Sequence, residues 1–116
     1  MRYAVAKPHR PSEEQWLAAQ QGTRLALERR ETVYAGWIWC VADSGAGGWV
    51  PEEWVSIAGD TCTLLRDYDA LELPVEPGDM VEVEFTESSW AFVQDERGRQ
   101  GWVPLECLEP LEGAPA

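Results

Sequence analysis

The stretch GWIWCVADSGAGGWVPEEWV, residues 36–55, has a near copy in SWAFVQDERGRQGWVPLECL, residues 89–108. The two align without a gap at an offset of 53 positions, which takes residue 37 to 90, 49 to 102 and 51 to 104. The alignment matches two tryptophans, two glycines, a Val-Pro pair and a glutamate. Chance would rarely place so many uncommon residues in register, so we infer an internal duplication.

Each copy is typical of β structure. Residues 36–42 and 90–94 are rich in aromatic and β-branched residues, and each run is followed by a glycine-containing turn. The second strand of each hairpin, GWVP, ends at a proline that cannot donate to a ladder. Upstream, residues 23–28 and 79–85 predict further strands, the latter because apolar and acidic residues alternate. Helical periodicity is convincing only at residues 12–21, for which a helical turn and an irregular loop both stay open.

Composition narrows the class of protein. The chain has 116 residues and no apolar run long enough to span a membrane. The N-terminus has no secretory pattern, so we expect a cytoplasmic protein. The three cysteines are odd in number and lack CxxC spacing, which disfavours a disulfide framework and a zinc site.

The net charge of −12 disfavours nucleic acid as a partner. Residues 1–58 carry −1 and residues 59–116 carry −11, so a cationic partner would be drawn to the second half.

Several motifs of the second half, over about residues 62–109, resemble an SH3 domain. LLRDYDALE (64–72) is similar to the opening ALYDY motif, and ELPVEPGD (72–79) to the element that ends in Gly-Asp. GWVPLECL (101–108) is similar to the closing motif, whereas the first half shares the closing elements but not the opening one. The whole resembles a bacterial-type tandem of variant SH3 domains. The resemblance implies an all-β fold of two small SH3-like partly open barrels, at residues 1–58 and 61–110. We expect the last residues, 111–116, to form a frayed tail.

The resemblance also implies a binding surface. SH3 domains hold a polyproline II segment between aromatic ridges, beside an acidic group that pairs with a basic ligand residue. Two positions depart from the family pattern, because Arg66 and Cys107 stand where tyrosines are usual. The matching positions are Tyr68, Glu72, Glu76, Trp90, Trp102 and Pro104 in the second half, and Trp37, Trp49, Pro51 and Trp54 in the first.

Two functions remain open from the sequence. The first is a non-catalytic protein-interaction module that binds a proline-containing or basic extended peptide. The alternative is a structural or self-association protein whose aromatic grooves are filled by the neighbouring domain or by a second chain, and a homodimer is left open. Trp37 and Trp90 fit ligand contact, interdomain packing or local packing. We expect no enzyme, since there is no catalytic triad or phosphate-binding loop, and no cofactor, metal, nucleic acid or membrane.

Overall fold

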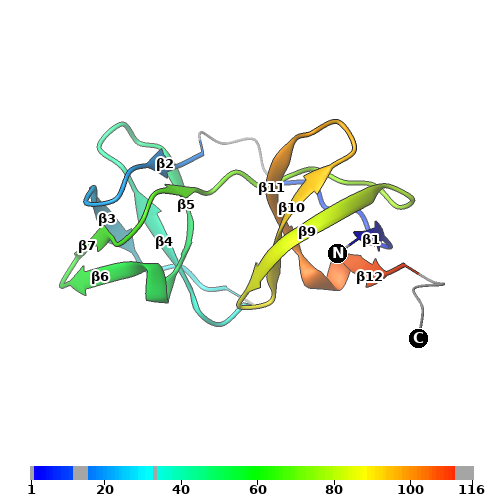
Figure 1. Ribbon diagram of the computed structural model, residues 1–116. Helices are drawn as coiled ribbons and strands as arrows, with labels where there is room; N and C mark the ends of the chain where they lie inside the picture. The colour runs from blue at the N-terminus through cyan, green and yellow to red at the C-terminus, as the bar shows by residue number, and fades with distance from the viewer. Residues whose placement is uncertain (1, 12–15, 33, 112–116) are drawn as a thin grey trace. The chain divides into compact units, whose positions relative to one another are not determined.

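The computed structural model describes residues 2–11, 16–32 and 34–111, which form β structure in two compact units (Figure 1). The terminal unit consists of residues 1–12 and 72–116, and the central unit of residues 13–71. The central unit is one continuous segment, whereas the terminal unit combines the two ends of the chain. The all-β prediction is confirmed, and within the described residues no helix has the length and apolar character to cross a membrane.

The central unit is built on a five-stranded antiparallel sheet in the order β5-β4-β3-β7-β6. A second, two-stranded sheet joins β2 to β8, and a short 3-10 helix, η1, follows β5. The sheet lies over a core in which Leu25, Val50 and Leu64 are almost fully buried. The element bounds are β2 Ala18–Ala19, β3 Arg24–Glu28, β4 Trp37–Val41, β5 Gly47–Pro51, η1 Glu52–Trp54, β6 Val55–Ala58, β7 Thr61–Leu64 and β8 Tyr68–Asp69.

The terminal unit has a sheet of corresponding order, β11-β10-β9-β1-β12. The long strand β9 curves along β10 on one side and β1 on the other (Figure 1). Its core includes Val5, Val81, Val93 and Val103. The element bounds are β1 Arg2–Val5, β9 Met80–Glu87, β10 Trp90–Asp95, β11 Gln100–Pro104, η2 Leu105–Cys107 and β12 Leu108–Pro110.

The first strand of each sequence half lies in the sheet of the other half. Strand β1 pairs with β9 and β12, whereas β7 pairs with β3 and β6. Corresponding backbone hydrogen bonds mark the exchange: Ala6 N–H donates to Cys107 O at 2.7 Å, and Leu65 N–H donates to Trp54 O at 2.9 Å. The predicted boundaries at 1–58 and 61–110 therefore do not coincide with the observed units, which divide between residues 12 and 13 and between 71 and 72.

Charge supplies a physical reason for this exchange. The terminal unit contains 5 Lys/Arg and 11 Asp/Glu, and the central unit contains 4 and 10, so each carries −6. The two sequence halves would instead carry −1 and −11. Moving the basic N-terminal segment onto the acidic second half reduces repulsion among its carboxylates.

Several local predictions agree with the structure. Strands β3, β4, β9 and β10 lie where the periodicity placed them. Within the stretch 12–21, for which a helical turn and a loop were both open, residues 18–19 form the short strand β2. Residues 12–15 and 112–116 lie outside the described residues. Two connections that correspond in the repeats differ in length: residues 29–36 join β3 to β4, whereas Ser88 and Ser89 alone join β9 to β10.

Candidate functional site

Tyr68 belongs to the central unit, whereas Trp90 and Trp102, with which the resemblance grouped it, belong to the terminal unit. Its hydroxyl donates a hydrogen bond to Trp49 O at 2.6 Å, and its ring meets Trp54 edge-on at a centroid distance of 5.5 Å. The resemblance grouped Tyr68 with residues of the second half of the sequence. In the structure, β7 pairs with β3 and β8 pairs with β2, so this segment joins sheets of the first half. It therefore joins the first-half residues Trp37, Trp49, Pro51 and Trp54.

His9 occupies the place beside Trp90 that Tyr68 was expected to fill. The two rings meet edge-on at a centroid distance of 5.4 Å. His9 Nε2 also lies 2.8 Å from Glu72 Oε1, and both side chains are largely buried. Sequence analysis assigned no role to His9. The available signal was the basic run Lys7-Pro8-His9-Arg10, which stands out in so acidic a chain.

Glu76, the second predicted acid, is also paired with the N-terminal segment. Arg10 Nε donates to Glu76 Oε2 at 3.1 Å, and Arg10 Nη2 donates to Oε1 at 3.2 Å. The hydrogen bonds and the carboxylate charge raise the pKa of Arg10. Both acids that the resemblance reserved for an external ligand are therefore engaged by residues 9 and 10 of the same chain.

Most of the predicted aromatic positions are buried. The exposed fraction is 6% for Trp37, 8% for Trp90, 3% for Trp102 and 5% for Tyr68. Pro51 and Pro104 are also buried, while Trp49 and Trp54 are half-buried. The expected ridge of bare rings is thus reduced to Trp49 and Trp54.

Two further aromatic clusters join neighbouring strands toward one edge of each five-stranded sheet. In the terminal unit, Phe85 stacks on Phe92 at 5.4 Å, and Trp102 meets both rings edge-on. In the central unit, Trp39 and Trp49 are register partners whose rings lie 5.2 Å apart. These contacts account for the burial of Trp102 and Trp39.

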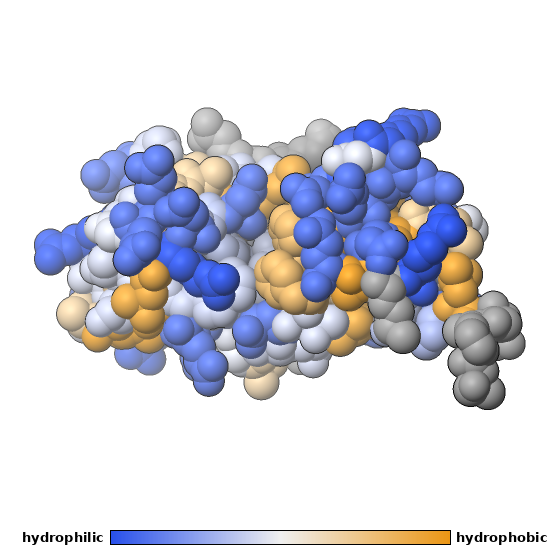
Figure 2. Space-filling model, viewed as in Figure 1, coloured by the Kyte–Doolittle hydropathy of each residue, from blue (hydrophilic) through white to orange (hydrophobic). Residues whose placement is uncertain are grey.

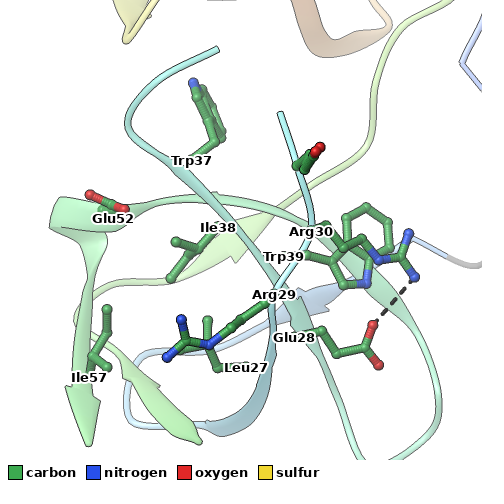
Figure 3. A pocket seen from close by; sticks show the side chains of 10 residues that line it. Leu27, Glu28, Arg29, Arg30, Trp37, Ile38, Trp39, Glu52 and Ile57 are labelled. Carbon is green, nitrogen blue, oxygen red and sulfur yellow. Dashed lines mark hydrogen bonds and ion pairs between the residues drawn. The ribbon is translucent and has the colours of Figure 1, made fainter. Parts of the chain in front are cut away.

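A hollow of ≈ 510 Å³ opens in the central unit (Figure 3). The connection after β3 forms one side, β4 another, and residues from η1 and β6 complete it. Ile57, from β6, is 50% exposed, and Figure 2 shows apolar surface in the region of this strand. The lining residues are Leu27, Glu28, Arg29, Arg30, Glu31, Trp37, Ile38, Trp39, Glu52 and Ile57.

The charged side chains around the hollow differ in their contacts. Arg30 lies over the Trp39 ring at 4.0 Å and forms a 3.4 Å ion pair with Glu28. Arg29 extends to the opposite side, toward Ile57 (Figure 3). In contrast to Glu28, neither Glu31 nor Glu52 forms an ion pair with another described residue. The hollow therefore combines an apolar floor with carboxylates that are open to a cation.

Sequence analysis missed the hollow as a site, although Trp37 was among the predicted residues. The available signal was the stretch between the predicted strands at 23–28 and 36–42, which is longer than the stretch between the strands at 79–85 and 90–94. In the part of the chain that the structure describes, no group of three His, Cys, Asp or Glu side chains is placed to hold a metal ion. Comparisons with protein-family models, with curated proteins and with solved structures found no significant match.

Proposed function

We propose that the protein is a non-catalytic interaction module whose central unit binds an extended peptide containing proline and basic residues. The hollow beside Trp37 and Trp39 is the observation that carries this proposal. Its apolar floor suits proline rings and aliphatic stems, and a ligand cation can pair with Glu31 or Glu52 at the rim. The resemblance of the sequence motifs to variant SH3 domains supports the same class of function.

The hollow is a better candidate for the binding site than the predicted groove of the terminal unit. Glu72 and Glu76 already contact His9 and Arg10. A basic peptide would have to break these contacts before it could use the same carboxylates. Both units carry a net charge of −6, so the preference for the hollow depends on the absence of ion pairs at Glu31 and Glu52 among the described residues and not on the net charge.

A peptide titration tests the proposal. Full-length protein is titrated with arginine- and proline-containing peptides while tryptophan fluorescence is followed. We expect saturable binding that weakens by roughly tenfold in the double variant Glu31→Lys/Glu52→Lys, because two attractive carboxylates become repulsive. Asp43→Lys is the control, since this exposed turn residue does not line the hollow.

Two outcomes count against the hollow. One is the absence of any fluorescence or indole resonance change over the whole titration. The other is a loss of affinity that, divided by the number of charges changed, is the same in the Asp43→Lys control as in the double variant. That result would indicate attraction of the peptide to the acidic chain as a whole.

Self-association is the second candidate function, and the pairing of β1 and β7 with strands of the other half of the sequence favours it. Each unit is completed by a strand from the other half of the sequence, so a second copy could supply the same strand. Light scattering after size-exclusion chromatography over a wide concentration range tests this candidate. A dimer with tryptophans shielded from acrylamide supports it, and a monomer at every concentration contradicts it.

A further inference from the structure

Two cysteine side chains meet in the core of the central unit. Cys40 Sγ on β4 and Cys62 Sγ on β7 lie 3.4 Å apart. Both residues are buried, with exposed fractions of 0% and 1%. Strand β3 connects them in register, since Leu27 pairs with Cys40 and Leu25 pairs with Cys62. Because paired residues share a face of the sheet, both thiols point into one core.

We propose that Cys40 and Cys62 are a site of disulfide formation that covalently fixes the exchanged strand β7 to β4. A disulfide has an S–S length of about 2.05 Å and joins Cα atoms no more than about 7 Å apart. The two sulfurs must therefore approach by more than an ångström, and because β3 lies between β4 and β7 the backbones of these strands must draw together as well. Cys62 belongs to the second half of the sequence and Cys40 to the first half. The bond would therefore link the two halves within one unit and oppose the departure of β7.

A small peroxide is the oxidant that the reaction requires. The thiolate of one cysteine attacks a peroxide oxygen, the O–O bond breaks, and a sulfenic acid and water are formed. The sulfur of the other cysteine then attacks the sulfenic sulfur, and the S–S bond forms as the hydroxyl group leaves as water with the thiol proton. Two thiols are oxidised to one disulfide, and one hydrogen peroxide is reduced to two waters.

The hollow gives a small oxidant a route toward these thiols. Leu27 and Ile57 line the hollow, and they are the register partners of Cys40 and Cys62 respectively. Ile57 is half exposed, so solvent reaches the strand next to Cys62. Neither cysteine lines the hollow, so a peroxide that enters it would reach sulfur only after displacement of side chains such as Leu27 and Ile57.

The environment of the thiols makes this reaction slow. Burial, followed by the hydrogen bond with Cys62, raises the pKa of Cys40. Since the thiolate is the reactive form, the rate should rise with pH and with local opening of β7. The pair is therefore suited to a durable link and not to rapid sensing of an oxidant.

The test uses the full chain with Cys107→Ser, which removes the third thiol. The protein is incubated with hydrogen peroxide at pH 7 and pH 9, alkylated and digested without reductant. We expect a linked peptide pair containing Cys40 and Cys62, a mass lower by two hydrogen atoms, and faster formation at pH 9. The thermal midpoint should rise by ~10 °C and return to its original value after reduction.

Cys40→Ser/Cys107→Ser is the matched control, because Cys62 alone has no partner for an intramolecular bond. It should show no linked peptide and no rise in midpoint under the same treatment. The proposal is overturned if the peptide map shows free thiols at both pH values, or sulfinic and sulfonic acids without a Cys40–Cys62 link. It is also overturned if the link forms but leaves the thermal midpoint unchanged or lowered.

Discussion

His9 and Glu72 are 63 residues apart in the chain, yet Nε2 of the imidazole lies 2.8 Å from a carboxylate oxygen. The imidazole also packs edge-on against Trp90, so a single side chain from the N-terminus joins both a predicted acid and a predicted aromatic residue. The contact is largely buried, with side-chain exposed fractions of 18% for His9 and 12% for Glu72. It therefore holds the N-terminal segment in the terminal unit.

The first prediction concerns this contact. Glu72→Gln should lower the free energy of unfolding by about 1–2 kcal/mol, because the buried imidazole loses a charged hydrogen-bond partner. Glu72→Lys should lower the free energy of unfolding further, since it places an unpaired cation beside His9. Equilibrium urea unfolding measures both changes. Glu76→Gln is the control, and its effect should be small because the pair with Arg10 is exposed. Equal effects of the Glu72 and Glu76 variants would contradict the assigned importance of the His9 contact.

The second prediction tests the strand exchange itself. A Cβ atom placed on Gly48 would overlap the Cβ of Ala70, a residue from the second half of the sequence. Gly48→Ala should therefore lower the free energy of unfolding by about 2 kcal/mol or more, because this core contact has no spare room. Adding Ala70→Gly should recover part of that loss. Urea unfolding of the two single variants and the double variant gives the coupling energy. Strict additivity would mean that the two residues are not in contact.

The third prediction is a stabilising change in the two-residue connection between β9 and β10. Ser88 and Ser89 both have positive φ angles, 47° and 76°, which L side chains adopt at a cost. Ser89→Gly should raise the free energy of unfolding by about 0.5–1 kcal/mol, because glycine is preferred at the second position of such a turn. Thermal and urea unfolding provide the measurement. Ser56→Gly in β6 is the control and should destabilise the protein, since glycine in a strand weakens it. A loss of stability in Ser89→Gly would show that the turn is not strained.

The fourth prediction concerns acid. Burial alone would raise the pKa of Asp95, but hydrogen bonds from Arg99 and Arg97 outweigh it and lower the pKa below the ordinary 3.8. A lowered pKa in the folded state stabilises the protein above the ordinary value, and the contribution disappears as pH falls through the lower, folded value. Asp95→Asn should therefore reduce stability by about 1 kcal/mol at pH 7 and by much less near pH 2.

Urea unfolding of Asp95→Asn and the parent chain at the two pH values checks the sign of this effect. Asp43→Asn serves as the control, because Asp43 is an exposed residue of the β4–β5 turn. Its substitution should change stability little at either pH. A difference between Asp95→Asn and the parent that grows toward low pH would contradict the assigned direction of the pKa shift.

The local elements could be predicted because their signals lie within short stretches of chain. The alternation in MVEVEF and the glycine-containing turns after Trp39 and Phe92 predicted strands that the structure contains. Val50 and Val103 occupy matching positions in the duplicated motif, and both are buried. These features depend on the two-residue period of a strand, which is visible without knowledge of its partner.

The groupings within the candidate site could not be predicted in the same way. Tyr68 follows β7 within the second half of the sequence, and its motif resembles the opening of an SH3 domain. Its hydrogen bond to Trp49 exists because β7 and β8 pair with strands of the first half. The role of His9 was missed for the same reason, since nothing near residue 9 identifies Glu72 and Trp90 as its neighbours.

The amino-acid sequence alone determined the duplicated motifs, the all-β class and the positions of the main strands, because side-chain alternation and turn residues act over a few positions. The tertiary structure decided which half each first strand completes, and with it the partners of Tyr68, His9 and Cys62. Both copies offer similar backbone hydrogen bonds to an incoming strand, so pairing of the backbone does not distinguish between them. The choice depends on core packing and on charges that come together only when the chain is folded.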